Sequence, residues 1–162
     1  MAAQSPPFPP RRRSRRGFTL VELLVAVSLA TVLMALAAPS FRELTARMRV
    51  EGVAHNLATD LQLARTEAVQ RRAAVNLVTA ADGASYSLTT GGNTIKSVPL
   101  GGGATLTASI TISFEALRGL ANAAVLDTSV SGTSAQLRVS SDVMGRVQMC
   151  SPSGVLKGYA TC

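Results

Sequence analysis

One stretch near the amino terminus limits what this chain can fold into more than any other. Residues 18–38 are 21 consecutive residues in which Glu22 is the single charged side chain, and arginines stand just before them at positions 11, 12, 13, 15 and 16. A helix of that length rises roughly 30 Å, the thickness of the hydrocarbon core of a bilayer. A carboxylate inside such a segment costs on the order of 3 kcal/mol, so Glu22 is expected to have a specific partner. The stretch therefore predicts a membrane-spanning helix that carries one functional carboxylate.

The distribution of charge predicts the orientation of this helix. Because basic residues tend to stay on the cytoplasmic side, everything after Pro39 is expected across the inner membrane, which is the periplasm of a Gram-negative cell. The net charge of +7 and the pI of about 10.7 are typical of a nucleic-acid binder. Without the five amino-terminal arginines, however, 11 basic residues face nine acidic ones. The high net charge therefore mostly reflects the arginines that orient the helix in the membrane, and it does not by itself indicate a nucleic-acid binder.

Helical periodicity continues beyond Pro39, where the proline tends to kink a helix rather than end it. Apolar residues recur at spacings of three and four, which defines one face of an amphipathic helix, at Phe41, Leu44, Met48, Ala54, Leu57, Leu61, Ala64 and Ala68. The opposite face is charged and is expected in solvent, with Arg42, Glu43, Arg47, Arg49, Asp60, Arg65, Glu67 and Arg71. We therefore predict one helix from Phe18 to about Arg72, whose second half packs on a small domain.

After Ala74 the sequence changes to short strand-like runs separated by Gly, Asn, Asp and Ser. Ala-Asp-Gly and Gly-Gly-Asn are hairpin signals between the first three runs. The expected strands are Val75–Thr79, Ser85–Thr90, Thr94–Leu100, Ala104–Phe114, Gln136–Ser140 and Arg146–Cys150. Glu115–Val130 is expected to be a loop with a short helical turn. A long helix followed by a small antiparallel β-sheet domain is an α+β architecture.

The run Gly-Phe-Thr-Leu-Val-Glu-Leu-Leu-Val, which begins at Gly17, resembles the start of type IV pilin precursors. The resemblance implies that prepilin peptidase cuts between Gly17 and Phe18, that Phe18 is then N-methylated, and that Glu22 pairs with the terminal amine of a neighbouring subunit. The chain then divides into a cleaved leader (1–17), a membrane and filament-core helix (18–38), an amphipathic periplasmic half-helix (39–73) and a β-rich periplasmic domain (74–162). A plain single-pass anchor would instead leave the chain uncut. A secretory signal peptide is the other alternative, but a glutamate early in its apolar core argues against it.

Within this superfamily, the segment that runs from Asn56 through Leu-Ala-Thr-Asp-Leu-Gln-Leu-Ala-Arg-Thr-Glu-Ala to Val69 resembles FimT/GspH-type minor pilins and pseudopilins. Gly145-Arg146-Val147-Gln148, followed by Cys150, is similar to their carboxyl-terminal end. The resemblance implies a structural subunit that primes the assembly of a type IV pilus or a type II secretion pseudopilus. Its partners would be prepilin peptidase, other subunits and the inner membrane.

Some members of the pilus branch bind DNA through a Gly-Arg-x-Arg motif, which makes a DNA-binding minor pilin for natural transformation the alternative function. Here Gln148 stands at the position of the second arginine, which removes one phosphate contact. Arg138, Arg146 and Lys157 are the candidate basic patch, with DNA as the partner. The simpler interpretation is that Gly145 and Arg146 form a hairpin turn and an exposed strand arginine.

Cys150 and Cys162 are the two cysteines of the chain, and an even pair in an oxidising periplasm predicts one disulfide, with two free thiols as the alternative. Their wide spacing and the lack of a nearby histidine argue against a metal site. The single histidine, His55, has no nucleophile at a catalytic spacing and is expected at an interface or in solvent. We therefore expect neither an enzyme nor a cofactor.

Overall fold

The structure, a computed structural model, describes residues 17–162. The arginines of the predicted leader lie outside the described residues. The chain separates into two compact units, with the boundary between Ala38 and Pro39.

The helix α1 spans Leu20–Arg71 and contains Pro39, close to the predicted limits. It begins at a capping residue, because the Glu22 backbone N–H donates to Thr19 Oγ1 at 3.2 Å. It ends in a Schellman motif: Arg72 adopts a positive φ of 52°, and the Ala73 N–H donates to the Ala68 carbonyl at 3.3 Å. By length and composition, α1 is able to cross a membrane.

The second half of α1 buries one stripe of apolar side chains, as the periodicity predicts. Several of these side chains are alanines, so the strands approach the helix closely. The buried apolar residues of α1 are Val50, Ala54, Leu57, Ala58, Leu61, Ala64 and Ala68.

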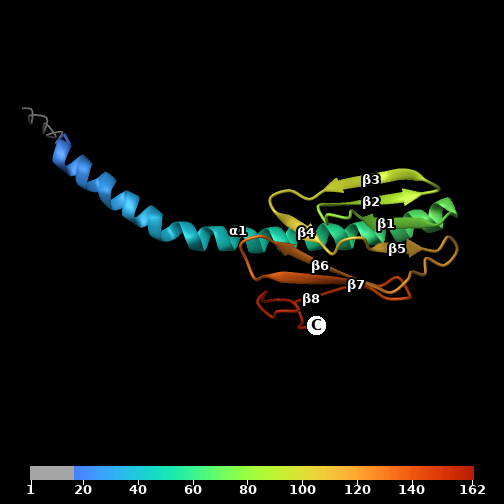
Figure 1. The fold of residues 1–162 in the computed structure, drawn as a ribbon. Helices are drawn as coiled ribbons and strands as arrows, with labels where there is room; N and C mark the ends of the chain where they lie inside the picture. The colour runs from blue at the N-terminus through green and yellow to red at the C-terminus, as the bar shows by residue number, and fades with distance from the viewer. Residues whose placement is uncertain (1–16) are drawn as a thin grey trace, which may run out of the picture. The chain divides into compact units, whose positions relative to one another are not determined.

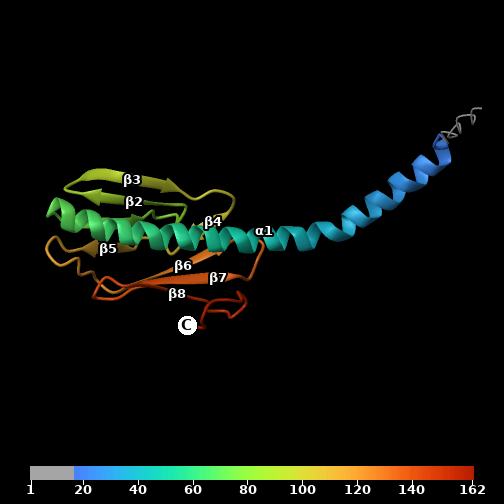
Figure 2. The ribbon, with the colours of Figure 1, turned by 180° about the vertical axis from the view of Figure 1, so that it is seen from behind.

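The α+β prediction is confirmed: within residues 17–162, α1 packs on a small antiparallel β-sheet domain whose eight strands form two four-stranded sheets. The first has the order β3-β2-β1-β5 and consists of β1 (Val75–Thr79), β2 (Ser85–Thr90), β3 (Asn93–Pro99) and β5 (Thr111–Phe114). The second has the order β4-β6-β7-β8 and consists of β4 (Ala104–Leu106), β6 (Ala124–Val130), β7 (Gln136–Ser141) and β8 (Val147–Cys150). In Figure 1 the strands lie in front of the second half of α1, and Figure 2, the view from behind, shows that half of the helix in front of both sheets.

Two predictions about the strands are wrong. Ala104–Phe114 is two strands in different sheets, because β4 pairs with β6 whereas β5 pairs with β1. The predicted loop Glu115–Val130 contains the seven-residue strand β6. Polar residues at buried positions of β6 obscure the alternation of apolar and polar residues that predicts a strand. Thr128 is such a residue: it is buried, and its hydroxyl donates to the Leu137 carbonyl at 2.8 Å.

One core joins α1 to both sheets. The strands contribute alternate residues, among them Leu77, Tyr86, Phe114, Leu126 and Leu137, and each of these is at most 1% exposed. The described buried apolar residues all lie at or after Val50. The unit Pro39–Cys162 therefore contains its own core.

Candidate functional site

The apolar segment that begins at Phe18 leaves its side chains uncovered. Phe18 is 82% exposed, Leu20 80% and Leu24 62%, and residues 18–38 are all exposed. Such a surface needs a covering of lipid or of other apolar helices. Gly17 stands just before the helix, and a Cβ built on it meets nothing within 4 Å.

Glu22 lies in the first turn of α1, three residues after the capping Thr19. A carboxylate at this position is favoured by the positive end of the helix dipole. Within residues 17–162 its side chain makes no hydrogen bond or ion pair, so the only local role of Glu22 is in the helix start. The arrangement leaves a carboxylate available to a cation from outside the described chain.

The carboxyl-terminal tail is fixed at two points. Cys150, at the end of β8, forms the predicted disulfide with Cys162, and their Cα atoms are 5.1 Å apart. Tyr159 Oη lies 2.8 Å from His55 Nε2, which ties the tail to α1 and places His55 at an interface. Burial, with a smaller contribution from the charge of Glu51, raises the pKa of Tyr159.

A tight turn joins β7 to β8 and presents Arg146. The Arg146 backbone N–H donates to Asp142 Oδ1 at 2.8 Å, and Arg146 Nε donates to Asp142 Oδ2 at 3.0 Å. The backbone bond is the main reason why the pKa of Asp142 is lowered. Gly145 completes the turn at φ 70°, where an added Cβ would lie 2.6 Å from the Gly119 carbonyl oxygen.

The structure does not gather the three predicted DNA-contacting residues into one patch. Arg138 donates to both carboxylate oxygens of Asp127, at 2.7 and 3.0 Å, and this bond raises the pKa of Arg138. Lys157 is exposed in the tail between the cysteines. Neither Arg138 nor Lys157 lines the groove beside Arg146.

A different arginine shares a site with Arg146. Arg65 Nη1 donates to the Gly145 carbonyl at 3.5 Å, which brings α1 and the β7–β8 turn together. A groove of about 500 Å³ lies between them, lined by Gln62, Arg65, Thr66, Gly145, Arg146, Val147 and Gln148. Periodicity placed Arg65 on a solvated face, and only the tertiary fold shows that it faces β8.

A buried ion pair was missed by the sequence reasoning. Asp60, expected on the solvated face of α1, is 3% exposed and lies against the β2–β3 hairpin. Its carboxylate accepts bonds from Lys96 Nζ at 2.6 and 2.8 Å and from Tyr86 Oη at 2.8 Å. Burial, and then the hydrogen bond to Asp60, raise the pKa of Tyr86 above its ordinary value of 10.0. This cluster fixes the first sheet on the helix.

In the part of the chain that the structure describes, no three His, Cys, Asp or Glu side chains lie close enough together to hold a metal ion.

A long helix, apolar at its start and packed at its end on antiparallel sheets, defines the pilin-like class of folds. Solved structures of two other proteins are among those that share it. The type IV minor pilin FimU of Pseudomonas aeruginosa (strain PAO1) has 22% identity and a TM-score of 0.54, over 65% of this chain and 91% of FimU. The minor pseudopilin EpsH from the type 2 secretion system of Vibrio cholerae has 15% identity and a TM-score of 0.52, over 64% of this chain and 98% of EpsH.

Sequence comparison identifies the family. Residues 53–154 match the family described as type II transport protein GspH, and residues 12–38 match the prokaryotic N-terminal methylation motif. The chain therefore belongs to the GspH family of minor pilins and pseudopilins. The pilin-like protein PilA1 of Thermus thermophilus is 39% identical over 71 residues, which are 44% of each chain, so the match spans less than half of that relative.

Proposed function

We propose that this protein is a filament subunit of a type IV pilus or a type II secretion pseudopilus, held in the inner membrane before assembly and active in starting it. The observation that carries the proposal is Glu22, a carboxylate without a side-chain partner in the described chain, set in an otherwise uncharged and fully exposed helical segment. In lipid such a charge is costly, and in a filament an amine from a neighbouring subunit neutralises it. Cleavage between Gly17 and Phe18 by prepilin peptidase, followed by methylation of Phe18, supplies that amine.

The first test is processing. The full chain is co-expressed with prepilin peptidase, and its intact mass is expected to correspond to a start at Phe18 plus one methyl group. Gly17→Leu is the control, because a side chain at Gly17 meets nothing in the fold and so changes recognition by the peptidase alone. An uncut wild-type chain would refute the proposal and leave a single-pass anchor.

The second test is assembly. Glu22→Gln is expected to be cut and methylated but to be excluded from sheared filaments, because a neutral amide cannot neutralise the amine. Glu43→Gln is the matched control, since Glu43 is a helix glutamate that pairs with Arg47 at 2.5 Å. Equal incorporation of the two variants would contradict the role given to Glu22.

A second candidate, DNA reception at a filament tip, is favoured by one observation: Arg65 joins Arg146 in the groove beside β8. Phosphate neutralisation by such arginines gives salt-dependent affinity. Fluorescence anisotropy of duplex DNA with Pro39–Cys162 is expected to show binding that falls steeply with salt and that weakens in Arg65→Ala and Arg146→Ala. Arg138→Ala is the control, because Arg138 does not line the groove and bonds to Asp127 instead. Absence of binding at low salt would remove this candidate.

A further inference from the structure

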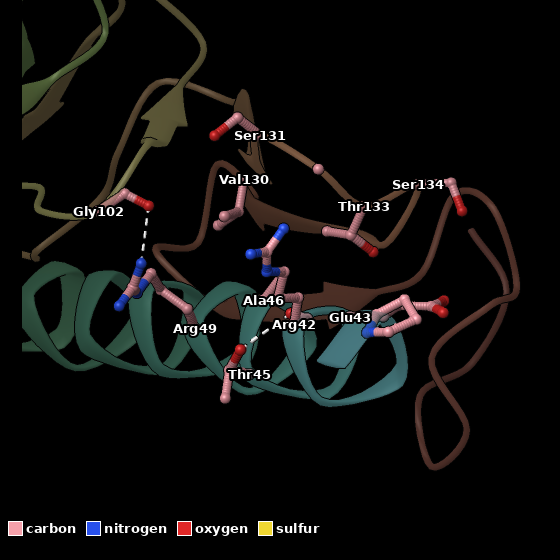
Figure 3. Close-up of a pocket in the computed structure, with 12 residues that line it drawn as sticks. Arg42, Glu43, Thr45, Ala46, Arg49, Gly102, Val130, Ser131, Thr133 and Ser134 are labelled. Atoms are coloured by element: carbon pink, nitrogen blue, oxygen red, sulfur yellow. Dashed lines mark hydrogen bonds between the residues drawn. The ribbon is translucent and has the colours of Figure 1, made fainter. Parts of the chain in front are cut away.

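A second pocket lies at the end of Pro39–Cys162 that follows the apolar segment. It measures about 650 Å³, and α1 forms one wall with Arg42 and Arg49. The opposite wall is the loop from β6 to β7, together with the glycine turn before β4 (Figure 3). Its lining includes Arg42, Arg49, Gly102, Ser131, Thr133 and Ser134.

The Arg49 guanidinium is held in place by the backbone. Its Nη1 donates to the Gly102 carbonyl at 2.8 Å (Figure 3). Gly102 has a φ of 64°, and a Cβ at this position would lie 1.9 Å from Arg49 Nη1. The missing side chain therefore makes room for the guanidinium. One of the five donors of Arg49 is used, and the others remain for a ligand.

The pocket also contains a second cation and several hydroxyl residues. In Figure 3 the Arg42 guanidinium lies between α1 and the β6–β7 loop. The loop adds the hydroxyls of Ser131, Thr133 and Ser134, and the Ala135 backbone N–H donates to Thr133 Oγ1 at 3.1 Å. This bond occupies a lone pair of Thr133 and leaves its O–H free to donate.

The charge of the pocket is positive. Glu43 is the one acidic residue of the lining, and its carboxylate pairs with Arg47. The two guanidiniums, in a pocket whose lining also includes three hydroxyl residues, offer donors to a phosphate group, which accepts several charge-assisted hydrogen bonds at once.

Chain connectivity places this pocket close to the membrane surface. Arg42 lies four positions after Ala38, the last residue of the apolar segment. Four residue steps span at most about 14 Å even when fully extended. Phosphate groups of lipids are concentrated at that surface, where basic pockets bind anionic head groups.

We infer that the Arg42–Arg49 pocket binds the phosphate of an anionic phospholipid head group, an inference that rests on the proposed membrane storage of the subunit. The bound head group sets the depth of the periplasmic unit at the bilayer and must be released when the subunit enters a filament. The pocket would recognise the anionic oxygens of a phosphate group, which a lipid head group carries as an ester and inorganic phosphate carries as the free ion.

The test uses the full chain in detergent micelles, with bound lipid counted by native mass spectrometry during titration. Phosphatidylglycerol is expected to bind in preference to phosphatidylcholine, whose ammonium group cancels the charge. Arg42→Gln/Arg49→Gln is expected to weaken phosphatidylglycerol binding by at least about tenfold, since each arginine supplies charge-assisted bonds. Gly102→Ala displaces Arg49 without changing the net charge, and it is expected to weaken binding severalfold.

The matched control is Arg71→Gln/Arg72→Gln, which removes the same charge at the far end of α1 and is expected to bind as the wild type does. Equal phosphatidylglycerol affinity in the wild type and in Arg42→Gln/Arg49→Gln would overturn the inference. Inorganic phosphate that displaces the lipid at equal concentration would support the anion site and overturn lipid as its source. Arginine-dependent binding of a duplex oligonucleotide in preference to phosphatidylglycerol would also overturn it.

The same experiment distinguishes failure of the proposed filament role from failure of the lipid site. The pocket lies wholly within Pro39–Cys162, so the micelle titration reports on it whether or not the chain is cut after Gly17. An uncut chain that still binds phosphatidylglycerol through the two arginines would refute the filament role and support the lipid site.

Discussion

The buried ion pair between α1 and the first sheet offers a sharp test of the fold. Asp60→Asn keeps the shape of the side chain but removes the charge that accepts bonds from Lys96 and Tyr86. Breaking a buried pair by removing one partner costs about 3–5 kcal/mol. The Lys96 side chain is 44% exposed, so its ammonium regains water and the cost moves to the lower end. We therefore expect a loss of about 3 kcal/mol in the free energy of unfolding.

The assay is urea unfolding of Pro39–Cys162 with the disulfide intact. A loss of this size moves the midpoint down by about 1–2 M at the usual dependence on urea. Asp127→Asn is the matched control, because Asp127 also pairs with a cation across strands but is 39% exposed, and its midpoint is expected to stay near that of the wild type. A midpoint for Asp60→Asn that equals the Asp127→Asn midpoint would refute the assignment of Asp60 to the core.

Three further predictions concern the carboxyl-terminal half and Tyr86. Cys150→Ser opens the loop to the tail and is expected to lower the free energy of unfolding by about 3 kcal/mol, as measured by urea midpoints beside a reduced wild type. Gly145→Ala is expected to cost about 1–3 kcal/mol because of its positive φ and the contact with the Gly119 carbonyl. Gly154→Ala, at φ 63° but in open space, should cost less, and equal melting temperatures for the two would contradict the contact. Because the folded pKa of Tyr86 is raised, stability is fully present below pH 10.0 and falls as the pH rises beyond it, a decline that Tyr86→Phe should reduce in thermal melts; an unchanged slope would count against the burial of the hydroxyl.

The elements with strong local signals could be predicted from the sequence. The limits of β1 and β2 match the prediction, because a turn containing Gly83 and a turn at Gly91–Gly92 separate the first hairpins, and all three glycines adopt positive φ. Helical spacing also identified the stripe of α1 that becomes buried. These features depend on neighbours within a few residues, which a single sequence displays.

The features that were missed depend on residues far apart in the chain. Asp60 resembles the other charged residues of α1, and only its partner 36 residues later makes it part of the core. Arg138 looks like a free cation until β6 places Asp127 opposite it. The sequence indicated the Gly145–Arg146 turn, but not that Arg65 faces it, since the side of a helix that meets an edge strand follows from sheet topology.

The position of the residue that caps α1 has a consequence for the proposed processing of the chain. Thr19, which lies after the proposed cut site, accepts the Glu22 N–H in the first turn of α1, so this capping bond lies wholly within the segment that the proposed cleavage would keep. The cleavage proposed after Gly17 would therefore leave the capping bond in place. On the proposed function, processing changes the charge and length of the chain while the described start of α1 keeps its cap.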